Sequence, residues 1–275
     1  MLTALLLAAA LPSTFDQVVS AERAFAAASI KVGQHQAFLN NLSQDAITFS
    51  PLPAPARPLH ENQPPAKGSL QWGPGWVAVS SAGDLAVSTG PWRIQLGDKT
   101  ILTEKQVQGW FISMWRLQAD GKWKVAVDAG VSSPMRYELP ENATNGSVAI
   151  PAGSPRVNDA ASATRAITAA ETAFAAAAKG GIGGAIEAAA DPQLRVYREG
   201  KAATFGADAS KASLAADQRA GVCAVDKLVA SKSGDLGYTY GTCTATGVDT
   251  AKYGFLHVWR LQANGTWKVL VDVTP

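Results

Sequence analysis

The amino-acid sequence predicts an α+β fold that is built twice, because one order of helix and antiparallel strands occurs in both halves of the chain. Three pairs of matching segments support this prediction. Residues 21–28 (AERAFAAA) match residues 170–177 (AETAFAAA), residues 81–85 (SAGDL) match residues 232–236 (KSGDL), and residues 109–128 match residues 254–272. Self-similarity at a fixed spacing indicates a repeated structural unit. Since the offset stays between 144 and 151 residues, the repeat includes most of each half.

Length and composition agree with two domains. The chain has 275 residues, of which 47% are hydrophobic and 17% charged, and one domain usually has roughly 100 to 200 residues. Residues 132–160 lack an apolar period and contain four prolines together with glycines and asparagines, a composition typical of a linker. We therefore expect a first domain at residues 13–131, a linker at 132–160 and a second domain at 161–275.

Residues 1–12 contain an apolar run of about ten residues that is typical of a signal peptide. We expect residues 1–12 to be this signal and the protein to be periplasmic or secreted. No lysine or arginine precedes the run, so the alternative is an apolar lead-in to the first helix. The run falls short of the roughly 20 residues that cross a bilayer, and we expect no membrane span.

Several classes of partner are excluded by the charges and by missing motifs. The 24 basic and 22 acidic residues are mixed along the chain and leave a net charge of +2, which does not favour nucleic acid. The glycines near residue 180 lack the Gly-Lys-Ser/Thr ending of a phosphate loop. Three scattered histidines and two cysteines do not have metal-ligand spacing. We expect no metal and no cofactor.

The first helix of each half has an acidic residue on its apolar side. Glu22 shares one helical face with Val18 and Phe25, and Glu171 occupies the matching place in the second half. A carboxyl group in apolar surroundings needs a partner, either in an ion pair or as a general acid or base. The glycines of residues 180–184 predict that the second copy's helix is broken.

The strands predict a sheet with two distinct faces, because successive side chains alternate between the faces. In residues 109–118 one face takes Phe111, Ser113, Trp115 and Leu117, and the other takes Trp110, Ile112, Met114 and Arg116. The Asp-Gly and Asn-Gly pairs that follow are strong hairpin signals. The chain then returns with Trp123, Val125 and Val127 on one face and with Lys124, Ala126 and Asp128 on the other.

The two cysteines predict a cross-strand disulfide. A three-residue loop with Gly234 in the left-handed conformation pairs residues whose numbers sum to 466, as those of Cys223 and Cys243 do. In an exported protein such a pair is expected to be oxidised, while two buried free thiols are the alternative. The matching positions of the first half, at an offset of 151, are Trp72 and Trp92.

The strings AERAFAAAS, AFLNNLSQDAITFSP, SSAGDLAVSTGPW and WRLQADGKWKVAVDAG resemble the SnoaL-like and uncharacterised bacterial branch of the nuclear transport factor 2-like superfamily. The resemblance implies two tandem cone-shaped domains, each with N-terminal helices packed on a strongly curved antiparallel sheet and a pocket at the open end. It also implies pairing through the sheets, which a tandem chain would satisfy internally as a monomeric pseudo-dimer. The superfamily includes ketosteroid isomerase, polyketide cyclases, limonene epoxide hydrolase, dehydratases and members that only bind or scaffold.

Four residues are candidates for catalysis. Asp128 and Asp272 end the last strand of each half, where a carboxylate in an apolar pocket can act as a general base; the alternative is pairing with Arg116 or Arg260 on the same strand face. His60 lies in the proline-rich loop of residues 51–65 and suits proton transfer, unless it is simply solvated. His257, whose counterpart is Ser113, has core packing as its alternative. Residues 13–131 contain no tyrosine, which excludes the constellation of ketosteroid isomerase in the first half.

The sequence predicts a small-molecule binding protein for an aromatic or lipophilic compound, because aromatic side chains are frequent and no complete catalytic set is present. The candidate ligand-binding residues are aromatic or flexible, with one cation: Trp76, Trp115, Met114, Tyr238, Tyr240, Arg195 and Trp259. Two alternatives stay open. One is a lyase, isomerase or hydrolase that uses a pocket carboxylate or histidine in one domain, and the other is an assembly or scaffold pair without ligand.

Overall fold

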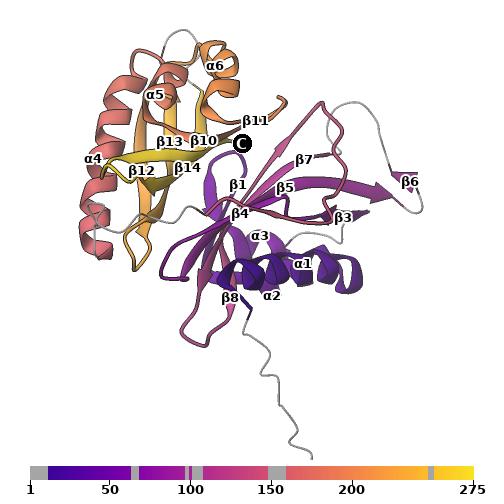
Figure 1. Cartoon of the computed structure of the whole chain (residues 1–275). Coiled ribbons are helices and arrows are strands. Elements are labelled where there is room, and N and C mark those ends of the chain that lie inside the picture. Colours follow the sequence, from indigo (N-terminus) through magenta and orange to yellow (C-terminus); the bar gives the residue numbers. More distant parts are fainter. Residues whose placement is uncertain (1–11, 63–67, 97–98, 101–107, 148–158, 247–250) are drawn as a thin grey trace, which may run out of the picture.

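The computed structural model describes residues 12–62, 68–96, 99–100, 108–147, 159–246 and 251–275. Residues 12–147 are called the first half below, and residues 159–275 the second half. Each half has helices that pack on one face of its own curved sheet (Figure 1). The α+β class and the two tandem units are therefore confirmed. The expected signal peptide lies outside the described residues, apart from its last residue.

The first half begins with two helices that meet at Gly33, whose φ is +88°. Its helices are α1 (Thr14–Val32), α2 (Gln34–Asn41) and α3 (Ala56–Asn62). Its strands are β1 (Leu42–Phe49), β2 (Pro53–Pro55), β3 (Ser69–Trp72), β4 (Trp76–Val79), β5 (Leu85–Leu96), β6 (Lys99–Thr100), β7 (Gln108–Leu117), β8 (Trp123–Ser132) and β9 (Thr144–Asn145). The sheet order is β2-β1-β8-β7-β5-β4-β9. Most neighbours are antiparallel, but β1 runs parallel to β8 and β9 runs parallel to β4.

The second half repeats this plan. Its helices are α4 (Ala160–Ala178), α5 (Ile182–Ala189) and α6 (Ala207–Ala215). Its strands are β10 (Ala190–Arg198), β11 (Thr204–Phe205), β12 (Gly221–Ala230), β13 (Leu236–Ala245), β14 (Lys252–Leu261) and β15 (Trp267–Thr274), in the order β11-β10-β15-β14-β13-β12. The predicted helix break is confirmed at Gly181, with φ at +152°, a conformation that glycine adopts readily. The first half has the same break, which the sequence prediction did not include.

Two segments expected to be irregular contain regular structure. The proline-rich segment that was predicted as a loop contains the helix α3, because Pro58 lies in its first turn, where a missing N–H does little harm. Residues 144–145 of the predicted linker form β9, which pairs with β4 of the first half. The ring of Tyr137 also packs against Trp110, with ring centroids 4.7 Å apart.

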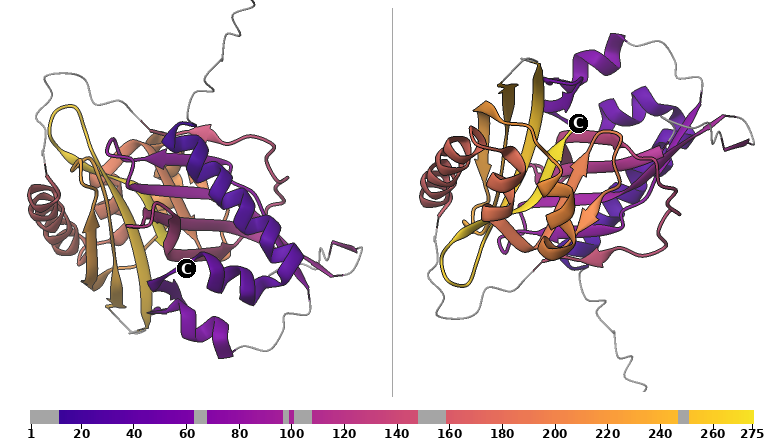
Figure 2. Two further views of the ribbon diagram at one scale, coloured as in Figure 1. Left: turned by 90° about the horizontal axis from the view of Figure 1, so that it is seen from below. Right: turned by 90° about the horizontal axis from the view of Figure 1, so that it is seen from above.

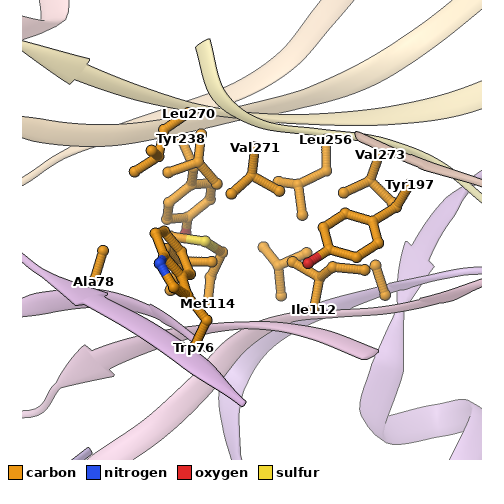
Figure 3. Packing of buried hydrophobic residues seen from close by; sticks show 14 of the residues in the cluster. Trp76, Ala78, Ile112, Met114, Tyr197, Tyr238, Leu256, Leu270, Val271 and Val273 are labelled. Atoms are coloured by element: carbon orange, nitrogen blue, oxygen red, sulfur yellow. The ribbon is translucent and has the colours of Figure 1, made fainter. Parts of the chain in front are cut away.

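The two sheets pack face to face and share one apolar core between the halves (Figures 1 and 2). Ile112 and Met114 of β7 lie on one side, and Leu256 of β14 and Val271 of β15 lie on the other (Figure 3). The opposite face of each sheet packs against that half's own helices. Both faces of each sheet are therefore buried, which explains why both sets of alternating residues are apolar.

The β4–β5 and β12–β13 turns contact one another reciprocally. The backbone N–H of Ser81 donates to Asp235 Oδ2 over 2.9 Å, and the backbone N–H of Lys232 donates to Asp84 Oδ2 over 3.0 Å. Asp84 and Asp235 are matching residues of the two halves. Mutual contacts of this kind are characteristic of a two-fold interface. Each half thus supplies the same two groups, an aspartate and a backbone N–H, to the contact between the turns.

A β-bulge in β8 and an equivalent one in β15 decide which residues face the helices. The register shifts between Met114 and Trp115 in the pairing of β7 with β8, and the equivalent shift lies between Val258 and Trp259. Val127 therefore joins the core between the halves instead of sharing a face with Trp123 and Val125. Asp128 faces the helices, opposite Ser113.

Because of this bulge, Asp128 and Asp272 do not form the expected ion pairs with Arg116 and Arg260 of their own hairpins. Arg116 pairs with Asp45 at 2.5 Å, and Arg260 pairs with Asp191. The extra residue reverses the facing of the strand after it. The strand-parity prediction was wrong for this reason.

The disulfide between Cys223 and Cys243 is confirmed, since the two residues are opposite one another and their sulfur atoms are bonded. The register near the turn differs from the prediction by one residue, because Ala230 pairs with Gly237. A bulge between Val225 and Lys227 then restores the predicted pairing. Trp72 and Trp92 are paired in the first half, as the offset predicted.

Candidate functional site

A pocket of about 340 Å³ lies in the first half between the helices and the inner face of the sheet. Residues of α1, α2, α3, β1, β3, β5, β7 and β8 line it. Most of its walls are aromatic or aliphatic, and six rings belong to Phe25, Phe38, Phe49, Trp72, Trp92 and Phe111. Its polar side chains are Gln34, Thr48, Ser50, His60, Ser113 and Asp128. The pocket combines an apolar wall with a few polar groups, as small-molecule sites usually do.

Asp128 is the acidic residue of the pocket wall. It lies in β8 between Thr48 of β1 and Ser113 of β7. Its side chain is partly buried, and it has no hydrogen-bond or ion-pair partner among the described residues. Burial, with a further contribution from the nearby Glu22, raises the pKa of the Asp128 carboxyl to about 7. Near neutral pH this carboxyl can therefore both accept and donate a proton.

Glu22 lies behind the pocket wall and is fully buried on α1. Trp72 Nε1 and Trp115 Nε1 donate to its two oxygens over 2.8 and 2.7 Å. Burial raises the pKa of Glu22 above its ordinary value, although the two indole N–H groups stabilise the carboxylate. The expected partner is thus a pair of neutral donors, so the predicted ion pair is not formed.

His60 of α3 also lines the pocket, where its ring stacks on Phe38 with the centroids 4.3 Å apart. Its buried Nδ1 has no hydrogen-bond partner among the described residues. Burial, together with the neighbouring His35, lowers the pKa of His60 to about 4. His60 is therefore a neutral imidazole at pH 7, in place of the solvated side chain that was the alternative.

In the second half, His257 occupies the position that matches Ser113 of the first half. Its Nδ1 lies 3.0 Å from Glu171 Oε1, and its Nε2 lies 3.6 Å from Asp272 Oδ1. Arg198 donates to the other oxygen of Asp272. Burial alone would raise the pKa of Glu171, but His257, with Thr239 and Trp259, holds it below its ordinary value. The carboxyl groups of Glu171 and Asp272 are therefore paired with two basic side chains of the same half, His257 and Arg198.

The two halves differ at two corresponding positions. His257 is paired with Asp272 in the sheet, and the residue paired with Asp128 is Ser113. Arg198, the last residue of β10, lies two residues beyond the partner of Asp272. The residue two beyond the partner of Asp128 is Ser50, which directly follows β1. Ser113 and Ser50 both line the pocket. Replacement of the two large bases by serines leaves Asp128 unpaired and the space beside it open.

The predicted ligand-binding residues lie in three different places. Trp76, Met114 and Tyr238 are buried in the core between the halves (Figure 3). Tyr240 packs at its edge, and the Arg195 guanidinium lies 4.8 Å from the Trp76 ring centroid and 3.9 Å from that of Phe205. Trp115 and Trp259 donate to Glu22 and Glu171 and are buried under the helices. None of these seven residues lines the pocket of the first half.

Other pocket residues were not among the sequence candidates. The sequence predicted Trp72 and Trp92 only as the counterparts of Cys223 and Cys243, and it did not single out Phe38. The alignment of the two halves could have indicated this site, because it matches Ser113 of the first half with His257 of the second.

A second cavity, of about 660 Å³, lies at the end of the second half. Its charged side chains have both signs: Arg198, Lys201 and Arg219 with Glu199 and Asp217. Arg198 and Arg219 are both paired with Asp217. Glu199 accepts hydrogen bonds from the backbone N–H and the hydroxyl of Ser132. Both acidic side chains named here therefore have partners, unlike Asp128.

Within the part of the chain that the structure describes, no cluster of histidine, cysteine, aspartate and glutamate has a geometry that could hold a metal ion. None of the helices in the described ranges is both long and apolar enough to cross a membrane.

Comparison with known proteins gives matches among solved structures only. No family model matches the chain, and no curated protein matches it. A ketosteroid isomerase-like protein from Erwinia carotovora atroseptica is 21% identical, with a TM-score of 0.35 over 40% of this chain and 92% of that one. An NTF2-like protein of unknown function from Pseudomonas putida is 15% identical, with a TM-score of 0.37 over 42% and 88%. One from Shewanella oneidensis is also 15% identical, with a TM-score of 0.35 over 40% and 97%. The solved structures to which the chain is similar thus include NTF2-like and ketosteroid isomerase-like proteins.

Proposed function

We propose that the protein binds a small aromatic or lipophilic molecule in the pocket of its first half. The observation behind this proposal is a cavity of about 340 Å³ that is walled by six aromatic rings and has one unpaired carboxyl group. Ligand pockets of proteins have volumes of roughly 300 to 1,000 Å³ and mostly apolar walls. The cavity is at the small end of this range, which favours a ligand of one or two rings.

In this proposal the second half is a supporting domain. His257 occupies the position that matches Ser113 of the pocket. The sheet of the second half covers the face of the first half's sheet that lies away from the pocket. The reciprocal contacts of Asp84 and Asp235 support an internal pseudo-dimer, and we propose that the chain is a monomer with domains at residues 13–131 and 161–275. The disulfide supports a periplasmic or secreted location.

The binding proposal can be tested by fluorescence, because Trp72 and Trp92 line the pocket. Titration with a panel of aromatic metabolites is expected to change the tryptophan emission and to raise the melting temperature. A Gly130→Leu variant should abolish this response. The Cβ added at Gly130 would point toward Trp92, 3.8 Å from Nε1, without a clash.

The matched control is Gly184→Leu on α5, where a Cβ meets no atom within 4 Å and the pocket is untouched. This variant should bind like the wild type. A flat emission and an unchanged melting temperature of the wild type across the panel would remove the proposal, as would an undiminished response of Gly130→Leu.

A second candidate function is proton transfer on the bound molecule, as in a lyase, isomerase or hydrolase. The observation that favours it is the Asp128 carboxyl, whose pKa is raised to about 7, in the same cavity as the neutral His60. A general base works best when its pKa lies near the working pH. Asp128 would take a proton from a carbon or oxygen of the ligand, and His60 would form a hydrogen bond with the ligand.

This candidate is tested by hydrogen exchange on a carbon next to a carbonyl group. The protein in D₂O is expected to exchange the α-hydrogens of a bound α-aryl ketone such as 2-tetralone, as seen by NMR. Asp128→Asn should stop the exchange while the ketone still binds. Exchange at the buffer rate with bound ketone would leave binding as the only function.

A further inference from the structure

The second half shows what the acidic and aromatic framework of the first half can hold. The imidazole of His257 lies between Glu171 and Asp272, at 3.0 and 3.6 Å. Its ring centroid is 4.6 Å from that of Phe174 and 4.6 Å from that of Phe255. The site therefore encloses one nitrogenous ring between two carboxyl groups and two phenyl rings.

The first half keeps this framework but lacks the enclosed ring. Glu22 and Asp128 correspond to the two acids, and Phe25 and Phe111 correspond to the two phenyl rings. Asp128, Phe25 and Phe111 line the pocket, whereas Ser113 stands where the second half has His257. No lysine or arginine is among the described residues that line it. The space is thus acidic and aromatic, and none of the basic side chains that the structure describes pairs with its carboxyl group.

We propose that this pocket selects ligands in which an aromatic body bears a cationic nitrogen, and that the nitrogen binds Asp128 on the side of Glu22. The inference rests on the proposed function of the pocket and specifies its ligand class. The ligand's ammonium, imidazolium or amidinium group takes the part that His257 and Arg198 have in the second half. Its aromatic body lies among the rings of the wall.

Two physical effects favour a cation there over a neutral molecule of the same shape. A positive nitrogen beside an aspartate forms a charge-assisted hydrogen bond, which is about twice as strong as a neutral one. Aromatic faces also attract a cation through the ring quadrupole. A neutral ligand would cover Asp128 and leave its negative charge in apolar surroundings without a partner, which is costly. An anionic ligand would add repulsion to this cost.

The test compares three probes with the same ring: 2-phenylethylamine, 2-phenylethanol and phenylacetate, titrated calorimetrically at pH 8. The amine is expected to bind about 10-fold or more tightly than the alcohol, as expected for one charged hydrogen bond, and phenylacetate is expected to bind least. In Asp128→Asn the preference of amine over alcohol should fall to about 1-fold, because the neutral amide lacks the charge. Ser113→His should exclude all three probes, since it supplies the imidazole found in the second half.

Asp226→Asn is the matched control, since Asp226 is an exposed acid on β12 of the second half and its loss should leave the preference unchanged. Equal affinity for amine and alcohol, or a preference for phenylacetate, overturns the inference and leaves the proposed function standing. The same holds if none of the three probes binds while neutral compounds of the aromatic panel do. If no compound binds at all, the proposed function fails, and the inference fails with it.

Discussion

The two halves differ most in how they treat one aspartate. Asp272 of the second half is fully buried and is paired with Arg198 and His257. Asp128 of the first half has no such partner among the described residues, and its pKa is raised to about 7. The strand pairing around this aspartate, the bulge, and the pairs Phe25 with Phe174 and Phe111 with Phe255 correspond in the two halves. Ser113 and Ser50 in place of His257 and Arg198 therefore distinguish the unpaired aspartate from the paired one, and the predictions below test this difference.

The largest effect is expected for His257→Ala. It leaves Glu171 and Asp272 buried without the imidazole between them, and the loss of one partner of a buried ionic group costs about 3 to 5 kcal/mol. Denaturant unfolding of wild type and variant measures the loss. Ser113→Ala at the matching position should cost less than about 1 kcal/mol, because no ion pair is lost. Equal costs at both positions would contradict the comparison.

The next effect is that of the disulfide, which is present in one half and replaced by two tryptophans in the other. Cys223 and Cys243 are 20 residues apart, and closure of such a loop stabilises a protein by about 3 kcal/mol. The double variant Cys223→Ala/Cys243→Ala should lose about this free energy of unfolding. Reductant should destabilise the wild type and leave the double variant unchanged. Two thiols labelled in the unreduced wild type would refute the oxidised pair.

Asp128→Asn is expected to stabilise the protein above pH 7. The pKa of Asp128 is raised in the folded state to about 7 from the ordinary value of 3.8, so the folded state holds a proton that the unfolded state has released. Its stability contribution is full below pH 4 and is lost as the pH rises through 7. The variant avoids this loss, which is about 2 to 4 kcal/mol.

The measurement for this pair is the unfolding free energy at pH 4 and pH 8. Asp128→Asn should match the wild type at the lower pH and exceed it at the higher one. Asp272→Asn should be destabilised at pH 8, because Asp272 is paired with Arg198. A destabilised Asp128→Asn at pH 8 would indicate that the carboxylate has a partner after all.

The smallest effect concerns the features that the halves share. Asp84→Ala and Asp235→Ala each remove one acceptor for the backbone of the other half's turn, and each should cost about 1 to 2 kcal/mol. Because both bonds belong to one contact, the double variant should lose less than the sum. A double-mutant cycle measures this, and a cost for only one of the two would show that the contact is not reciprocal.

Much of the fold could be predicted from the sequence, because it depends on repeats and turns. The repeated segments gave the two units, and the Gly234 turn with Cys223 and Cys243 gave a correct strand pair. The bulges could not be predicted, since Val125, Ala126 and Val127 are all apolar and a shift among them leaves no trace in the pattern. The facing of Asp128 followed from that shift.

The site was less predictable for a related reason. Both faces of β7 are apolar, because one meets the helices and the other meets the second half. The alternation of side chains along the strand assigned each residue to one of these two faces, but it did not show which face lines the pocket. Trp76, Met114 and Tyr238 were therefore assigned to a ligand, although they lie between the halves. Apolar residues on both faces are themselves a sign that a sheet is covered twice.

The face-to-face packing of the two sheets in one chain has a consequence for how the site could diversify. In a homodimer every substitution occurs twice, so a histidine that fills one pocket fills the other as well. A single chain has no such constraint. Because residues 113 and 257 are encoded separately, one can be serine and the other histidine. The association of the sheets is also part of folding, so dilution does not separate them, unlike the subunits of a dimer.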